Sequence, residues 1–173
     1  MKKILLLLTI FISMKSAAQV EYDRVDDPES GTMFFKGIID FHELSNEPAF
    51  TWFHSGVEAY SPNMEMIDRL RDQLRHYNLV VLLGTWCEDS QNLIPKLYRT
   101  LQLAEYPETQ VKVIAVDRNK EGKNGEHKEY KAKLVPTIIV LKDDKEIGRI
   151  TETVEESIEK DLDRIISGKS QVK

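Results

Sequence analysis

From residue 61 onward, the apolar residues of this chain occur either at helical spacing or in unbroken runs. One helical face is apolar at Met64, Ile67, Leu70 and Leu74. Ser61-Pro62, a capping hydroxyl followed by proline, is typical of the start of that helix. Residues 79–83 are all apolar, which predicts a strand buried on both faces of a sheet.

The same patterns predict the rest of the fold. We expect, in order, a helix apolar at Leu93, Leu97 and Leu101, a strand at 111–116, a short helix at 128–133, strands at 137–141 and 146–151, and a helix apolar at Val154, Ile158, Leu162 and Ile165 that Gly168 ends. The short Asp143-Asp144 turn makes the last two strands antiparallel. This order predicts an α/β fold, a three-layer sandwich with a mixed central sheet flanked by helices.

The first eighteen residues have the order of a signal peptide. Lys2 and Lys3 precede an apolar run at 4–13, and Ser16-Ala17-Ala18 supplies the small residues that a signal peptidase requires. We therefore expect cleavage before Gln19 and an exported protein, periplasmic or secreted, without stable membrane insertion after cleavage. An uncleaved membrane anchor is the alternative.

Residues 19–60 form a segment with its own composition. Residues 19–31 are polar and charged, and we expect them to be a loose leader. Seven of the 14 aromatic residues follow: Phe34, Phe35, Phe41, Phe50, Trp52, Phe53 and Tyr60. Their large side chains must be buried, either against the domain expected at 61–173 or in a groove that holds a ligand or partner.

Composition and charge exclude several classes of function. The length of 173 residues fits one compact domain with a short extension. A net charge of −5 removes the basic surface on which nucleic-acid binding depends. The single cysteine excludes an internal disulfide, and the four histidines lack ligand spacing, so we expect neither a metal nor a cofactor.

The candidate chemistry centres on Cys87, which directly follows a predicted strand and begins a predicted helix. Unpaired N–H groups and the helix dipole at such a position favour a thiolate. We expect Ser90 to add a hydrogen bond to the sulfur, and Trp86 to shield it and offer an apolar surface. The alternative is that Cys87 is buried and packs as a small apolar residue.

Two prolines accompany this cysteine. Pro95 lies inside the helix that begins at Cys87, where it should kink the helix without ending it. The Val135-Pro136-Thr137 string directly before a strand is a candidate for a cis proline. A cis bond there would leave the backbone of Val135 free to pair with an extended peptide.

With these features the sequence resembles the thioredoxin family over roughly residues 79–167. The string from Gly84 to Ser90, Gly-Thr-Trp-Cys-Glu-Asp-Ser, together with the aromatic segment ahead of it, resembles more narrowly a set of exported thioredoxin-like proteins of Bacteroidetes type. The resemblance implies thiol–disulfide exchange, with Cys87 as the attacking sulfur. It also implies that Trp86, Val135, Pro136 and Thr137 border the substrate site.

The chain departs from that family at three positions. The second active-site cysteine of thioredoxins corresponds to Ser90, so the motif has one thiol. The buried acid that precedes the nucleophile by six residues corresponds to Val81, and the lysine that faces this acid falls near Val113. The proton relay that serves the second cysteine is therefore absent.

Two functions remain open at this stage. The first is a monothiol oxidoreductase, of isomerase or deglutathionylation type. Cys87 would form a mixed disulfide with a protein or peptide substrate, and an external thiol would resolve it. The second is a redox-inactive module that binds an extended peptide or protein in the same groove. The fold alone does not choose between them.

Overall fold

The structure is a computed structural model that describes residues 21–168. The expected signal peptide, residues 1–18, lies outside the described residues. The elements are β1 (Tyr22–Asp27), β2 (Thr32–Ile39), α1 (Phe41–Asn46), α2 (Thr51–Ala59), α3 (Met64–Gln73), β3 (Asn78–Leu83), α4 (Glu88–Leu103), β4 (Val111–Ala115), α5 (Glu126–Glu129), β5 (Thr137–Lys142), β6 (Lys145–Thr151) and α6 (Ile158–Ile166), with short 3-10 turns at Leu74–His76 and Glu108–Gln110.

The strands form one mixed sheet in the order β1-β2-β4-β3-β5-β6. The central pair, β3 and β4, is parallel, and every other neighbouring pair is antiparallel. In the register, Leu83 lies opposite Ala115 on β4, and Leu82 lies opposite Thr137 on β5. The carboxyl ends of β3 and β4 therefore meet the first residue of β5 at one edge of the sheet.

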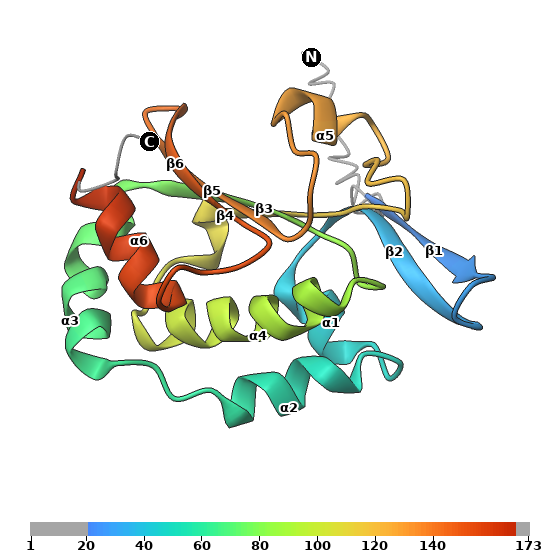
Figure 1. Ribbon diagram of the computed structural model, residues 1–173, viewed down its shortest axis with the longest axis horizontal. Coiled ribbons are helices and arrows are strands. Elements are labelled where there is room, and N and C mark those ends of the chain that lie inside the picture. Colours follow the sequence, from blue (N-terminus) through green and yellow to red (C-terminus); the bar gives the residue numbers. More distant parts are fainter. Residues whose placement is uncertain (1–20, 169–173) are drawn as a thin grey trace, which may run out of the picture.

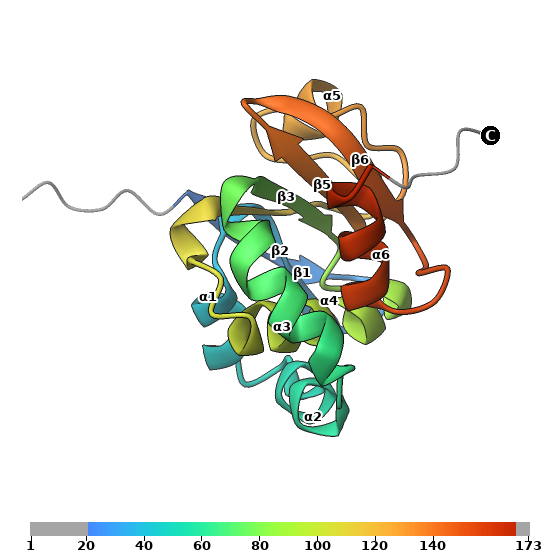
Figure 2. The same ribbon diagram turned by 90° about the vertical axis from the view of Figure 1, so that its left-hand side faces the viewer.

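The two faces of the sheet are covered very differently. Helices α1 to α4 and α6 lie on one side, and the short α5 with its flanking loops lies on the other (Figures 1 and 2). The predicted α/β three-layer sandwich with a mixed sheet is confirmed, with a thin third layer. None of the helices in residues 21–168 combines the length and apolar character needed to cross a membrane.

The alternation of side chains along the buried strands explains the two layers. Leu79, Val81 and Leu83 of β3 face the core shared with the helices. Val80 and Leu82 point the other way, into a smaller apolar cluster beneath α5 that also contains Ile114, Val116, Ala132, Val135 and Ile139. An unbroken apolar run therefore serves both faces, as expected for a strand buried on both sides.

The N-terminal segment is built into the same sheet and core. The expectation of a loose leader at residues 19–31 is wrong for Tyr22–Asp27, which pairs along its whole length with β2. Strand β2 in turn pairs with β4 through Gly37, Ile38 and Ile39. Five of the seven aromatic residues are buried: Phe34, Phe35, Phe41, Phe50 and Phe53.

Several element ends differ from the sequence-based expectation. The helix expected to start at Ser61-Pro62 begins at Met64, because the side chain of Asn63 accepts a hydrogen bond from the N–H of Met66 and caps it. The last helix begins at Ile158, not near Val154, because Ser157 caps it by accepting from the N–H of Lys160. The short helix expected at 128–133 lies at Glu126–Glu129. Pro95 lies within α4, which continues past it to Leu103.

Phe35 tests whether the N-terminal segment contributes to the stability of the fold. Its ring is 1% exposed and lies 4.7 Å from the ring of Tyr22 and 4.9 Å from that of Phe50. We expect Phe35→Ala to lower the free energy of unfolding by about 3–5 kcal/mol in a denaturant titration, because it opens a cavity in the core. Met64→Ala, at a side chain 51% exposed, is the control and should change it by less than about 0.5 kcal/mol. A similar small change for Phe35→Ala would mean that the segment packs on a domain stable without it.

Candidate functional site

Cys87 occupies the N-cap position of α4, at the end of the loop that follows β3. Its N–H donates to the carbonyl of Gly84 at 2.9 Å, and its own carbonyl accepts from the N–H of Gln91 at 2.9 Å. The side chain is half-buried. These backbone bonds fix the cysteine at the first turn of the helix, while the sulfur remains partly accessible.

The sulfur faces the loop before β5. The Cys87 Sγ lies 3.5 Å from the carbonyl oxygen of Val135, and the thiol donates to it. The structure shows no hydrogen bond between Ser90 and the sulfur. Ser90 is fully buried, and its Oγ accepts from the N–H of Gly84 at 3.2 Å. Ser90 therefore binds the loop between β3 and α4 through Gly84, and it forms no hydrogen bond with the sulfur.

The loop opposite Cys87 leaves one backbone donor without a hydrogen-bond partner in the described chain, although Val135, Pro136 and Thr137 are themselves buried. The Val135–Pro136 peptide bond is cis. The carbonyl of Pro136 accepts from the N–H of Glu152 at 2.8 Å, whereas the N–H of Val135 has no hydrogen-bond partner within residues 21–168. Thr137 is buried, and its hydroxyl donates to the carbonyl of Leu134 in the same loop.

Trp86 lies beside Cys87 and is held on three sides. Its indole N–H donates to the carbonyl of Val116 at 2.9 Å. Its ring packs against Gly84, where a Cβ atom would lie 2.7 Å from the indole Cε2. The guanidinium carbon of Arg118 lies 5.2 Å from the centre of the ring, within the range of a cation–π interaction.

Arg118 is itself paired with the buried carboxylate of Asp27, the last residue of β1. Two guanidinium nitrogens donate to the two carboxylate oxygens, Nε to Oδ1 at 3.0 Å and Nη2 to Oδ2 at 2.7 Å. The hydroxyl of Ser30 and the N–H of Glu29 also donate to this carboxylate. The hydrogen bonds from Arg118 in particular hold the pKa of Asp27 well below its ordinary value of 3.8.

Two valines occupy the positions at which the resemblance to thioredoxins places an acid and a lysine. Val81 and Val113 are buried in the main core and lie directly opposite each other in the β3–β4 register. No titratable group stands behind Cys87 at these two positions. Within residues 21–168, no group of three or more histidine, cysteine or acidic side chains is arranged to hold a metal ion.

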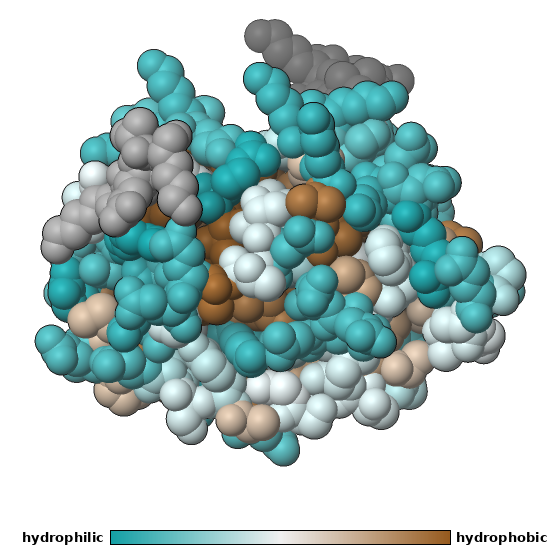
Figure 3. Space-filling model, viewed as in Figure 1, coloured by the Kyte–Doolittle hydropathy of each residue, from teal (hydrophilic) through white to brown (hydrophobic). Residues whose placement is uncertain are grey.

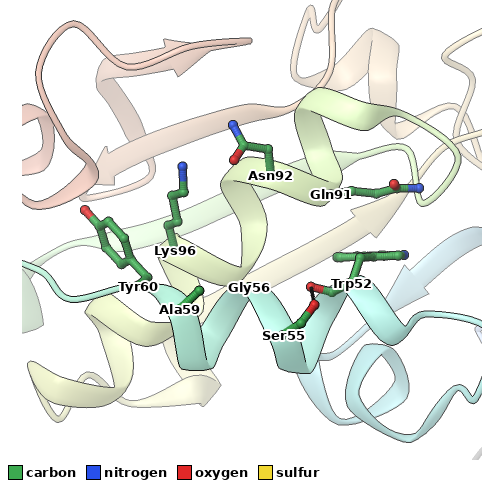
Figure 4. Close-up of a pocket in the computed structure, with 8 residues that line it drawn as sticks. All are labelled: Trp52, Ser55, Gly56, Ala59, Tyr60, Gln91, Asn92 and Lys96. Carbon is green, nitrogen blue, oxygen red and sulfur yellow. Dashed lines mark hydrogen bonds between the residues drawn. The ribbon is translucent and has the colours of Figure 1, made fainter.

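A groove of about 390 Å³ runs between α2 and α4 (Figure 4). The first residue of α4 that lines it, Gln91, follows Cys87 by four residues. Trp52 and Tyr60 line it from the side of α2, and Gln91, Asn92 and Lys96 line it from α4. The helices approach closely at its floor, where a Cβ atom on Gly56 would lie 2.7 Å from Cβ of Pro95. Trp52 and Tyr60, the two of the seven aromatic residues at 34–60 that are not fully buried, therefore form one wall of a surface groove.

On the face seen in Figure 3, apolar side chains gather in a central hollow bordered by hydrophilic ones. The hollow lies between α4, α6 and the chain that leads into β5, by comparison with Figure 1.

The sequence analysis identified Trp86, Cys87 and Val135 as neighbours across this fold. It did not identify Arg118 or Asp27, because neither residue belongs to a recognisable motif and the ion pair joins segments 91 residues apart.

Comparisons with known proteins agree with this architecture. A family model described as thioredoxin matches residues 53–160, more than half of the chain. Among solved structures, the chain is similar to a protein of unknown function from Pseudomonas aeruginosa, with 18% identity, a TM-score of 0.49, and coverage of 75% of this chain and 82% of that one. It is also similar to oxidized mitochondrial thioredoxin 3 from Saccharomyces cerevisiae, with 18% identity, a TM-score of 0.38, and coverage of 65% and 97%. No curated protein matches the chain significantly.

The depressed pKa of Asp27 predicts how stability depends on pH. A group whose pKa is lower in the folded than in the unfolded state stabilises the fold above the unfolded value, and this contribution is lost as the pH falls toward the folded value. We expect the difference in free energy of unfolding between wild type and Asp27→Asn to be constant from about pH 8 to about pH 5, and to shrink below about pH 4.

The control for this measurement is Asp23→Asn. It breaks an ion pair from the same hairpin, between Asp23 and Lys123, in which both side chains are partly exposed. Denaturant titrations should show a change of less than about 1 kcal/mol for this variant at neutral pH. A difference between wild type and Asp27→Asn that stays constant down to about pH 2 would contradict the assignment of the lowered pKa to Asp27.

Proposed function

This chain belongs to the thioredoxin family, and we propose that it exchanges thiols and disulfides through one nucleophilic sulfur, that of Cys87. The observation that carries the proposal is the position of this sulfur. It stands half-exposed at the N-cap of a sixteen-residue helix, 3.5 Å from the carbonyl of Val135. The adjacent Val135 N–H has no partner in the described chain, which supports a role in binding extended backbone.

The reaction begins when Cys87 loses its proton. The thiolate attacks one sulfur of a substrate disulfide, so that a bond forms between Cys87 and the substrate and the second substrate sulfur leaves as a thiolate. An external thiolate, or another cysteine of the substrate, then attacks the mixed disulfide and releases the Cys87 thiolate. With a second substrate cysteine the cycle is an isomerisation without net redox change. With an external thiol, the substrate is reduced and that thiol is oxidised.

The absence of a second cysteine in the motif favours these monothiol reactions over dithiol reduction. Ser90 stands one turn from Cys87 and cannot displace a bound substrate. Val81 and Val113 cannot deprotonate a second thiol, and none is present to need it. The proposed substrates are therefore proteins or peptides that carry a disulfide, and the proposed resolving partner is an external thiol.

The proposed location is outside the cytoplasm, in the periplasm or in the secreted fraction. The basic, apolar and small-residue order of the first eighteen residues supports it. Disulfide-bonded substrates persist in such compartments.

The groove between α2 and α4 favours a second candidate, a binding module in which Cys87 does not react. The groove combines two aromatic side chains with the polar ends of Gln91, Asn92 and Lys96. Such a lining suits a segment of a polypeptide as well as it suits the flank of a disulfide substrate. The reactivity of Cys87 distinguishes the two functions.

We expect Cys87 to form a mixed disulfide readily with a peptide that carries glutathione on its single cysteine. Folded wild type at neutral pH should give an adduct detectable by intact mass, at least as fast as a free cysteine peptide does, because the sulfur is accessible at a helix N-terminus. Cys87→Ser should give no adduct while keeping the same melting temperature. A folded wild type that stays unmodified while the urea-unfolded protein reacts would favour the binding module.

Replacing Ser90 should convert the site to dithiol chemistry. In Ser90→Cys the new sulfur lies one turn from Cys87 on the same helix, and we expect an internal disulfide and an increase of about tenfold or more in insulin reduction at fixed external thiol. Thr100→Cys is the matched control, because Thr100 is also fully buried on α4 but lies thirteen residues, roughly 20 Å, further along the helix. Equal rates for the two variants would show that a sulfur at residue 90 cannot reach the mixed disulfide.

A further inference from the structure

The β1–β2 hairpin reaches the loops that hold Cys87 through three separate contacts. The N–H of Phe35 donates to Oγ1 of Thr85 at 3.1 Å, two residues before Cys87. The ammonium group of Lys36 pairs with Asp117 at 2.6 Å, in the loop after β4. Asp27, the last residue of β1, pairs with Arg118 in the same loop. A segment outside the family match therefore supports both loops at the carboxyl end of the central strands.

The pairing of Asp27 with Arg118 is built to fix the orientation of the guanidinium. The carboxylate of Asp27 is completely buried and accepts two parallel bonds from Arg118. Such a fork defines the plane of the guanidinium, whereas a lysine would supply only a point charge. Glu29 binds the remaining nitrogen, Nη1, at 2.9 Å. All three nitrogens of the guanidinium are thus engaged, two by Asp27 at the end of β1 and one by Glu29 in the turn that follows.

The oriented guanidinium lies against the indole of Trp86. The ring is fixed on its other edges by the carbonyl of Val116 and by the backbone of Gly84. Trp86 is half-buried, directly precedes Cys87 and packs with it against the same small apolar cluster, so its ring borders the surface beside the sulfur. A chain of direct contacts therefore runs from Asp27 through Arg118 to Trp86.

We propose that Arg118, oriented by Asp27, is a positioning residue that holds Trp86 as one wall of the substrate site at Cys87. The β1–β2 hairpin is on this account part of the site and not only part of the fold. The proposal rests on the proposed exchange function for its kinetic consequence. Its structural consequence, the immobilisation of Trp86, does not depend on that function.

A purely stabilising ion pair would not require this arrangement. Burial of a carboxylate requires a partner with good geometry, and apolar residues of similar size often stabilise a fold as well as a buried ion pair does. In this ion pair the guanidinium of Arg118 lies over the ring of Trp86, and the Arg118 side chain remains about one third exposed. A positioning role explains why the guanidinium of Arg118 lies over the indole of Trp86.

The test uses a Trp52→Phe background, which leaves Trp86 as the single tryptophan. In this background we compare Arg118→Gln, Arg118→Lys and Asp27→Asn with the parent protein. Acrylamide quenching of fluorescence reports the mobility and exposure of Trp86. The rate of mixed-disulfide formation with the glutathionylated peptide measures how well a peptide substrate fits beside Trp86. The rate of alkylation by iodoacetamide measures the reactivity of the Cys87 sulfur toward a small reagent.

We expect quenching to increase at least twofold and the peptide rate to fall roughly tenfold in Arg118→Gln and Asp27→Asn, since small displacements in a site have large effects on rate. Alkylation by the small reagent should change less than about threefold, because it does not need the wall. Arg118→Lys keeps the charge but loses the fork, so it should resemble Arg118→Gln. All rates are measured below the melting transition of every variant.

Lys123→Gln is the matched control. It breaks the ion pair with Asp23, which joins β1 to the same loop after β4 but does not contact Trp86. Quenching and both rates should match those of the parent protein. The proposal is overturned if Arg118→Gln matches Lys123→Gln in quenching and in peptide rate, even when its melting temperature falls, because the ion pair would then be structural only. If the parent protein forms no adduct at all, the proposed function fails, and increased quenching in Arg118→Gln would still support the positioning of Trp86.

Discussion

The candidate site depends on the place of β3 between a parallel and an antiparallel neighbour. The parallel pairing brings the carboxyl ends of β3 and β4 together, and the N–H of Val116 donates to the carbonyl of Leu83 where they end. The antiparallel pairing with β5 brings Thr137, and with it the Val135–Pro136 bond, to the same edge. These two pairings bring Trp86, Cys87 and Val135 together, although the three residues lie up to 49 positions apart in the chain.

The unequal cover of the two sheet faces decides which parts of the protein surround that edge. The thick helical layer buries one side of α4 at Leu93, Leu97 and Leu101, whereas Glu88 and Asp89 in its first turn are exposed. The N-terminal segment completes this layer through Phe41 and Phe53, and it extends the sheet beyond β4. The buried aromatic rings of the N-terminal segment therefore stabilise its packing on the core. The polar contacts of the β1–β2 hairpin connect it to the loops at the site.

Much of this could be predicted from the sequence, and the reasons for the failures are physical. The buried strand at 79–83, the helix that begins at Cys87 and the Val135-Pro136 string depend on local patterns that short-range chemistry determines. Strand β1 was missed because it is a polar, half-exposed edge strand. Tyr22 and Val25 are its only uncharged residues, and their spacing of three does not give the alternation of a strand. The prediction of a hydrogen bond from Ser90 to the sulfur was wrong. Ser90, three residues after Cys87, faces the core, and its hydroxyl accepts from the N–H of Gly84 there. The Asp27–Arg118 pair follows from tertiary structure alone.

The central claim is that Cys87 and the backbone of Val135 act together on an extended disulfide substrate. Hydrogen exchange at the amide of Val135 tests it most directly, with free protein compared with protein carrying a peptide in mixed disulfide at Cys87. The account predicts that this N–H, which has no partner in the described chain, becomes strongly protected when the peptide is attached and pairs with it. Unchanged exchange at Val135 in a fully formed adduct would contradict the claim, because the substrate would then be held by the sulfur alone.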